Sequence, residues 1–159
     1  MLFLRSLFFA LLLPGSVTLL IPYFILSGPR GVPVPQRSPI QFFPLAVILA
    51  GAAILIRCIA EFARLGRGTL APVDPPKDLV IQGLYRYVRN PMYVGVLLVL
   101  LGESALFWSR AMLTYSAVWF LIVNLFVILY EEPALQRRFG DSYDQYRRAV
   151  GRWIPRRVK

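Results

Sequence analysis

A chain of 159 residues holds enough material for one domain. Its hydrophobic fraction is 57%, above the roughly 45–50% of soluble domains, and its charged fraction is 16%, below their usual value of about 25%. A soluble domain this small could not bury so much apolar surface, so the composition predicts a membrane protein. The net charge of +10 fits basic helix flanks that face anionic membrane lipid, and this interpretation is favoured over a nucleic-acid partner.

Four apolar stretches are long enough, or nearly so, to cross about 30 Å of hydrocarbon as helices. They are residues 2–26, 42–62, 93–108 and 111–130, and the third is short. The first stretch has a basic residue before its apolar core, as a signal peptide does. Its length and the lack of a small-residue cleavage site favour a retained span. The sequence therefore predicts an all-α integral membrane bundle of about four transmembrane helices.

The connections between these stretches predict the orientation. Residues 27–39 and 66–91 are rich in proline or glycine, which is typical of loops. A cytoplasmic N-terminus puts most Lys and Arg residues on the cytoplasmic side, so both termini are expected there. Residues 1–65 would form an N-terminal two-span hairpin. Residues 66–159 would hold the cytoplasmic loop, the second hairpin and the C-terminal segment, within one structural unit.

The character of the chain changes after the fourth span. Apolar residues recur there at spacings of three or four: Leu135, Phe139, Tyr143, Tyr146 and Val150. This period predicts a basic amphipathic helix that lies on the membrane surface or covers the bundle. Gly140 weakens this helix locally.

Polar residues within the spans need partners, because an ionised side chain at the centre of a span costs about 2.5–3.5 kcal/mol or more. Arg57 and Glu61 are spaced as an i,i+4 ion pair, and Glu103 is expected to face the bundle interior. The alternative is a transporter that uses these three residues as a proton or cation path. Cys58 lies in an apolar run and is expected to pack there. The absence of histidine excludes a histidine base and a histidine metal ligand.

Glu131 and Glu132 are adjacent at the cytoplasmic end of the fourth span. Two neighbouring carboxylates repel one another, so nearby cations are expected unless the helix end is simply solvated. The candidate cations are Arg86, Arg89, Arg137 and Arg138.

A second polar cluster, residues 82–95, comes directly before the third span. Pro91 suits the first turn of a helix, where the free N–H groups form an anion site. The tyrosines Tyr85, Tyr87 and Tyr93 could bracket a flat ring or a sulfonium, although an aromatic belt at the membrane interface explains them equally well.

The two clusters follow patterns with fixed spacing. The first pattern comprises Gly83, Tyr85, Arg89, Asn90, Pro91, Tyr93 and Gly95, and the second comprises Glu131, Glu132, Leu135, Phe139, Gly140, Tyr143 and Tyr146. With residues 68–72 and the tail 152–155, they resemble the isoprenylcysteine carboxyl methyltransferase-like family of membrane methyltransferases, which is related to phospholipid methyltransferases.

The resemblance implies S-adenosylmethionine as methyl donor and a lipophilic or prenylated acceptor that reaches a cytoplasmic-side site from the bilayer. By position, the cofactor would be bound by Gln82, Tyr85, Arg89, Asn90, Tyr93, Glu131 and Glu132. Catalytic roles would fall to Arg89 on the cofactor carboxylate, Glu132 on its amino or hydroxyl groups, and Arg138 on an anionic acceptor.

One position departs from the family pattern, since Asn90 stands where histidine is commonest. Asparagine cannot titrate near neutral pH. Methyl transfer to a carboxylate needs no proton removal, which favours O-methylation of an isoprenylcysteine-type or other carboxylate over an amine or thiol. The alternative that Asn90 supports is a catalytically inactive family member that serves as a membrane partner.

Overall fold

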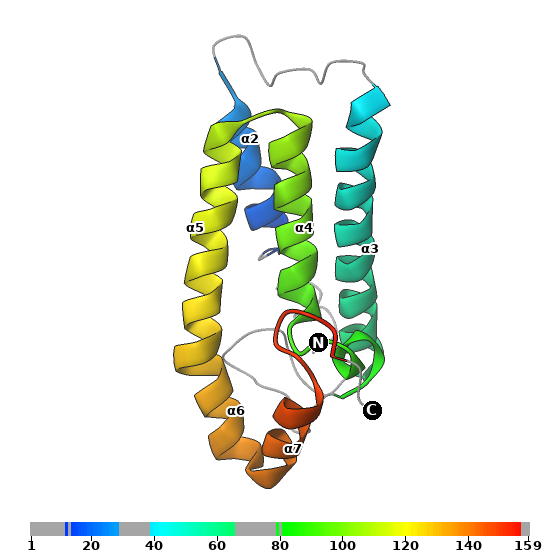
Figure 1. The fold of residues 1–159 in the computed structure, drawn as a ribbon, viewed down its shortest axis with the longest axis vertical. Helices are drawn as coiled ribbons and strands as arrows, with labels where there is room; N and C mark the ends of the chain where they lie inside the picture. Colours follow the sequence, from blue (N-terminus) through cyan, green and yellow to red (C-terminus); the bar gives the residue numbers. More distant parts are fainter. Residues whose placement is uncertain (1–11, 13, 29–38, 66–78, 80, 157–159) are drawn as a thin grey trace.

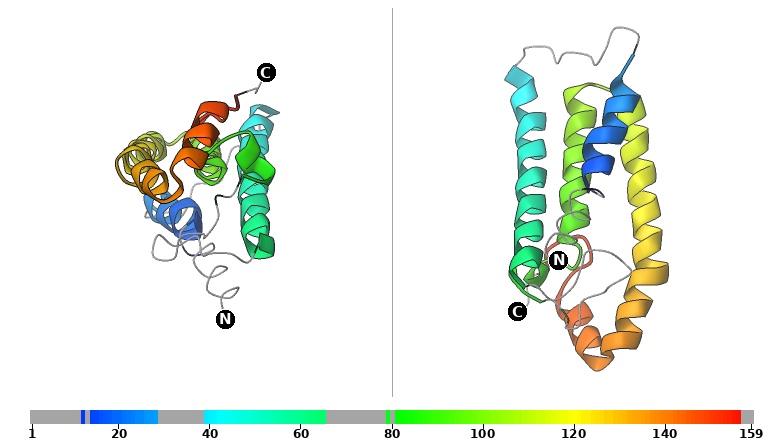
Figure 2. Two further views of the ribbon diagram at one scale, coloured as in Figure 1. Left: turned by 90° about the horizontal axis from the view of Figure 1, so that it is seen from below. Right: turned by 180° about the vertical axis from the view of Figure 1, so that it is seen from behind.

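The computed structural model describes residues 12, 14–28, 39–65, 79 and 81–156. Over these ranges the backbone is helical apart from turns and isolated bridging residues, which confirms the all-α prediction. The elements are η1 (Ser16–Leu20), α2 (Ile21–Leu26), η2 (Pro39–Gln41), α3 (Phe42–Leu65), η3 (Gly83–Arg86), α4 (Pro91–Leu106), α5 (Arg110–Phe126), η4 (Val127–Glu131), α6 (Glu132–Phe139) and α7 (Asp141–Ala149). Helix α4 lies between α3 and α5, and α6 and α7 extend the bundle at one end (Figures 1 and 2).

Two helical stretches of the described chain are long and apolar enough to cross a membrane. They are Phe42–Glu61, with 20 residues, and the continuous run Arg110–Phe139, with 30 residues. At a rise of about 1.5 Å per residue, either is long enough for the hydrocarbon core. The apolar segments Ser16–Leu26 and Pro91–Leu106 are shorter. Part of the predicted first span, residues 1–11 and 13, lies outside the described residues, and so do residues 29–38, 66–78 and 80 of the predicted loops. The four-span arrangement therefore stays a prediction.

Glycines bring α3 and α4 into close contact. A Cβ atom on Gly51 would lie 2.6 Å from the carbonyl oxygen of Gly95, and one on Gly102 would lie 2.5 Å from Ile48 Cγ1. Any larger side chain at these positions would force the backbones apart. Small residues of this kind let membrane helices approach closely enough for dispersion contacts to stabilise the pair.

The buried core lies along α4. Its fully or nearly buried apolar members are Leu55, Val96, Val99, Leu100 and Met112. Ser104 and Ser116 hydrogen-bond to one another across α4 and α5 at 3.2 Å, so two buried hydroxyls have partners. Cys58 is fully buried and not in a disulfide, in agreement with its apolar context.

The run Arg110–Phe139 changes to π-helical geometry over η4, just before a proline. The Glu132 N–H bonds to the Val127 carbonyl five residues back, and Pro133 has no N–H to continue an ordinary ladder. The wider turn carries the helix past the proline without a break. The predicted fourth span, residues 111–130, is therefore part of a longer helix that continues to Phe139.

The C-terminal region forms two helices where the sequence predicts one. Gly140 adopts φ 50°, a left-handed value that ends α6 and starts α7 in a new direction. The predicted apolar face is retained in part, because Tyr143, Tyr146 and Val150 form a buried cluster against Leu135 and Phe139. The turn at Gly140 thus folds the amphipathic segment back on itself.

Candidate functional site

The segment before α4 is bound to the C-terminal region. Tyr146 Oη donates a hydrogen bond to the Tyr85 carbonyl at 2.7 Å, and the Arg89 N–H donates to the Gly151 carbonyl at 2.9 Å. Val88 and Gly151 form a parallel bridge at the same point. Figure 1 shows the C-terminal segment, in red, passing beside the start of α4, in green. Segments about 60 residues apart in the sequence therefore meet at this end of the bundle.

Three charged side chains join these segments. Arg89 Nη1 lies 3.0 Å from Glu132 Oε1, and both side chains are about nine-tenths buried. Arg152 forms a fork on the same carboxylate, with Nε 2.6 Å from Oε1 and Nη2 2.8 Å from Oε2. We call Arg89, Glu132 and Arg152 the Glu132 cluster. Forked arginine–carboxylate pairs are among the strongest polar contacts in proteins, so the cluster links the Arg152 side chain to α6 and to the segment before α4.

Neighbouring polar groups support the Glu132 cluster. Arg89 Nη1 donates to Tyr143 Oη at 3.3 Å, and Asn90 Nδ2 donates to the Arg152 carbonyl at 3.2 Å. The hydrogen bonds to Glu132 raise the pKa of the Arg152 guanidinium, and burial raises the pKa of the Tyr143 phenol. Both groups therefore keep their protons at neutral pH. Asn90 thus contacts the tail through its amide, and this contact needs no titratable group.

Glu131, next to Glu132, contacts a different partner. Its Oε2 accepts a hydrogen bond from Tyr93 Oη at 3.3 Å. The Tyr93 ring centroid lies 6.4 Å from those of Trp119 and Trp153, and Phe120 meets Trp153 at 5.2 Å. We call Tyr93, Trp119, Phe120 and Trp153 the aromatic wall. A carboxylate beside such a wall is the combination that binds organic cations.

Two buried polar atoms near the Glu132 cluster have no hydrogen-bond partner within the described part of the chain: Arg89 Nε and Gln136 Oε1. Buried polar groups in native proteins are nearly always paired, so an unused donor or acceptor at such a place is available to a ligand or water. Arg89 Nε is the more informative atom, because a charged donor without a partner is costly to bury.

The structure brings most of the predicted site residues to one place. Arg89, Glu131 and Glu132 meet as described, and burial raises the pKa of the Tyr85 phenol, which lies near Glu131. Two predicted residues are not in this group. Gln82 is exposed, and the exposed Arg138 lies 5.7 Å from the ring of its neighbour Phe139.

Other residues that contact this group were not among the predicted site residues: Asn124, Tyr143, Tyr146, Arg152 and Trp153. The signal for Arg152 and Trp153 was present, because the tail 152–155 matches the family pattern. Trp153 Nε1 donates to Asn124 Oδ1 at 3.0 Å, which fixes the tail against α5. The spacing of the tail residues along the chain contains no information about these contacts.

The residues of the transporter alternative do not form a continuous path. Arg57 and Glu61 make the predicted i,i+4 pair at 3.3 Å near the Glu132 end of the bundle. The Glu61 carboxylate lies against Gly83, whose φ of 59° and missing Cβ make room for it. Glu103 lies three turns along α4 from Pro91, and its Oε2 is buried without a partner among the described residues.

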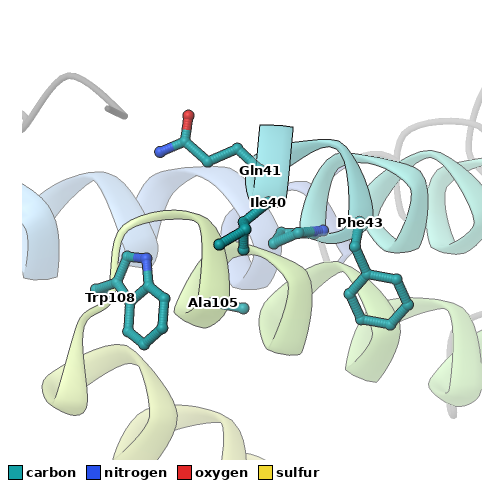
Figure 3. A pocket seen from close by; sticks show the side chains of 6 residues that line it. Ile40, Gln41, Phe43, Ala105 and Trp108 are labelled. Carbon is teal, nitrogen blue, oxygen red and sulfur yellow. The ribbon is translucent and has the colours of Figure 1, made fainter. Parts of the chain in front are cut away.

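The described chain also has a hollow of about 430 Å³ at the opposite end of the bundle. Its lining residues are Ile40, Gln41, Phe43, Pro44, Ala105 and Trp108 (Figure 3). None of them titrates, so this hollow offers no acid–base or ionic chemistry. Among the residues that the structure describes, no three His, Cys, Asp or Glu side chains are grouped as metal ligands.

Comparison with known proteins gives the site a family context. Protein-S-isoprenylcysteine O-methyltransferase of Schizosaccharomyces pombe is 40% identical over 78 residues, which are 48% of this chain and 33% of that protein. Methanethiol S-methyltransferase of Crocosphaera subtropica is 37% identical over 84 residues, 50% of this chain and 30% of that protein. Phosphatidylethanolamine N-methyltransferase of Schizosaccharomyces pombe is 31% identical over 116 residues, 69% of this chain and 12% of that protein.

The chain thus spans a third or less of the length of these three relatives. No solved structure matches it. A family model described as phospholipid methyltransferase matches residues 40–142, which is more than half of the chain and includes Arg89 and Glu132. Together with the two helices long enough to span a bilayer, this match identifies a membrane protein. The chain belongs to the phospholipid methyltransferase family.

Proposed function

We propose that the chain is a multi-pass membrane methyltransferase that uses S-adenosylmethionine and acts on a lipophilic acceptor. The observation that supports this most strongly is the Glu132 cluster, which joins three separate segments at one end of the bundle beside the aromatic wall. Both termini and the site would face the cytoplasm, in keeping with the distribution of basic residues.

The residues present fit such a cofactor. Glu132 and Glu131 would hold its amino and hydroxyl groups, and Arg89, with a buried Nε that has no partner, would hold its carboxylate. Tyr93 would face the sulfonium through its ring. Tyr85 and Asn90, which lie beside the Glu132 cluster, would complete the pocket, and the exposed Gln82 could contact the cofactor only from outside the cluster.

When bound, S-adenosylmethionine supplies an electrophilic methyl group that a nucleophile attacks from the side opposite the sulfur. The contribution of the chain would be to orient the reactants and exclude water. We propose a carboxylate acceptor of the isoprenylcysteine type, because an ionised carboxylate needs no base and Asn90 supplies none. Arg138, exposed on α6, would meet the anionic acceptor.

Binding of S-adenosylhomocysteine to the full chain in lipid nanodiscs tests the proposal. Saturable binding is expected, and Glu132→Gln should abolish it because the carboxylate at the centre of the cluster is lost. Glu103→Gln is the matched control, since Glu103 lies near the C-terminal end of α4, away from the Glu132 cluster. This variant should bind S-adenosylhomocysteine as tightly as the wild type does. An absence of saturable binding to the wild-type chain would end the proposal.

A further inference from the structure

Arg152 differs from the other members of the Glu132 cluster because it comes from the tail beyond α7. Its side chain is 32% exposed, whereas that of Glu132 is 10% exposed. The fork therefore lies at the edge of the site, with Glu132 inside and Arg152 toward solvent. A ligand that enters from water would meet Arg152 first.

The backbone of the tail is fixed independently of this fork. The Gly151 carbonyl accepts from the Arg89 N–H, and the Arg152 carbonyl accepts from Asn90 Nδ2. Trp153 bonds to Asn124 on α5. The Arg152 side chain can therefore leave Glu132 while its backbone stays in place.

The cluster also has unused binding capacity. Arg89 Nε is buried and has no partner among the described residues, although Nη1 of the same guanidinium pairs with Glu132. A carboxylate placed between Arg89 and Arg152 would use this donor. If Arg152 turned to that carboxylate, Glu132 would lose its ion pair with Arg152. A cation on the same ligand would have to take the place of the Arg152 guanidinium beside Glu132.

A ligand group with an ammonium and a carboxylate on one carbon meets both conditions. We infer that Arg152 is a binding residue for the α-amino acid end of the cofactor. Without ligand it pairs with Glu132, and with ligand the ammonium takes its place on Glu132 while the carboxylate pairs with Arg152 and Arg89. Every buried charge has a partner before and after this exchange. The inference rests on the proposed use of S-adenosylmethionine.

Two ligands that differ at this end provide the test. S-adenosylhomocysteine has the α-amino acid group, and 5′-methylthioadenosine has the same adenosine and thioether without it. Their dissociation constants are measured with the full chain in nanodiscs. Arg152→Gln should weaken S-adenosylhomocysteine about ten- to a hundredfold, the size of one charge-assisted contact, and leave 5′-methylthioadenosine unchanged. Arg152→Lys keeps the positive charge but not the forked geometry, so its dissociation constant for S-adenosylhomocysteine should lie between those of Arg152→Gln and the wild type.

Arg147→Gln is the matched control, because Arg147 lies on α7 and makes a surface i,i+3 ion pair with Asp144 on the same helix. It should change neither constant. An equal loss for both ligands in Arg152→Gln, or a fall in its ligand-free thermal midpoint that accounts for the loss, would mean a structural role and overturn the inference. Tighter S-adenosylhomocysteine binding would mean that Arg152 only blocks the site, which overturns it too.

The wild-type measurement separates this inference from the proposed function. If the wild-type chain binds neither ligand, the proposed function fails and the inference fails with it. If it binds S-adenosylhomocysteine and Arg152→Gln binds it equally well, the inference fails alone. If 5′-methylthioadenosine binds the wild type as tightly as S-adenosylhomocysteine does, the amino acid end is not recognised and the inference fails as well.

Discussion

Replacing Glu132 with glutamine should destabilise the folded chain. The wild-type carboxylate accepts from Arg152 at 2.6 and 2.8 Å and pairs with Arg89 at 3.0 Å. A glutamine amide has the same size but no charge, so it leaves the Arg89 guanidinium, with 9% of its side chain exposed, without a counter-ion. Removing one partner of a buried pair costs about 3–5 kcal/mol. Water reaches the Arg152 side chain, which is 32% exposed, and this reduces the contribution of Arg152 to the loss of stability. We therefore expect the free energy of unfolding to fall by about 3 kcal/mol.

Denaturant unfolding in one detergent, followed by circular dichroism, measures this loss. Glu131→Gln is the comparison, because its amide oxygen can still accept from Tyr93, and a loss below about 1 kcal/mol is expected. The double variant Arg89→Met/Glu132→Gln should lose less than the sum of its single losses, since the charge leaves with its partner. Equal stability of Glu132→Gln and wild type would refute this account of the cluster.

Three further predictions concern packing and titration. Gly51→Ala should lower stability by about 1–3 kcal/mol, because its Cβ would lie 2.6 Å from the Gly95 carbonyl oxygen. Gly15→Ala, at a helical position where a Cβ would meet no atom of the described residues within 4 Å, should raise stability by about 0.5–1 kcal/mol in the same unfolding assay. Tyr146→Phe should cost about 1–2 kcal/mol, since the Tyr85 carbonyl loses a 2.7 Å donor. Burial raises the pKa of Tyr146 above its ordinary 10.0, so the unfolded state loses this proton at a lower pH than the folded state does. The free energy of unfolding should therefore fall as the pH rises above about 10, and it should fall less steeply in Tyr146→Phe.

The meeting of Arg89 and Glu132 could be predicted from the sequence. Each lies at a helix end beside a predicted hairpin, and the two ends of a helical hairpin are adjacent. A charged residue next to a span also needs a partner, which limits the choice to a few arginines. The structure pairs Arg89 with Glu132 at 3.0 Å, whereas Arg138, another of these candidates, is exposed and outside the cluster.

The position of the C-terminal tail could not be predicted. It depends on Gly140, whose φ of 50° sets the direction of α7, and on contacts such as the one between Asn90 and the Arg152 carbonyl. A helical period gives the face that each residue occupies, but not the angle at which one helix leaves another. Sequence reasoning therefore found the apolar face of this region, predicted one helix where there are two, and gave Arg152 no role.

The adjacent glutamates show how local backbone geometry decides a site. On an ordinary helix, consecutive side chains point about 100° apart, so Glu131 and Glu132 would not be expected to serve one pocket. They lie where η4 meets α6, beside Pro133, and each contacts a different residue near the start of α4: Glu131 the phenol of Tyr93, and Glu132 the guanidinium of Arg89. Separate partners reduce the repulsion between the two carboxylates. Pro133 and the π-helical turn thus lie beside two neighbouring acids that both contact residues near the start of α4, and π-helical turns are frequent at functional sites.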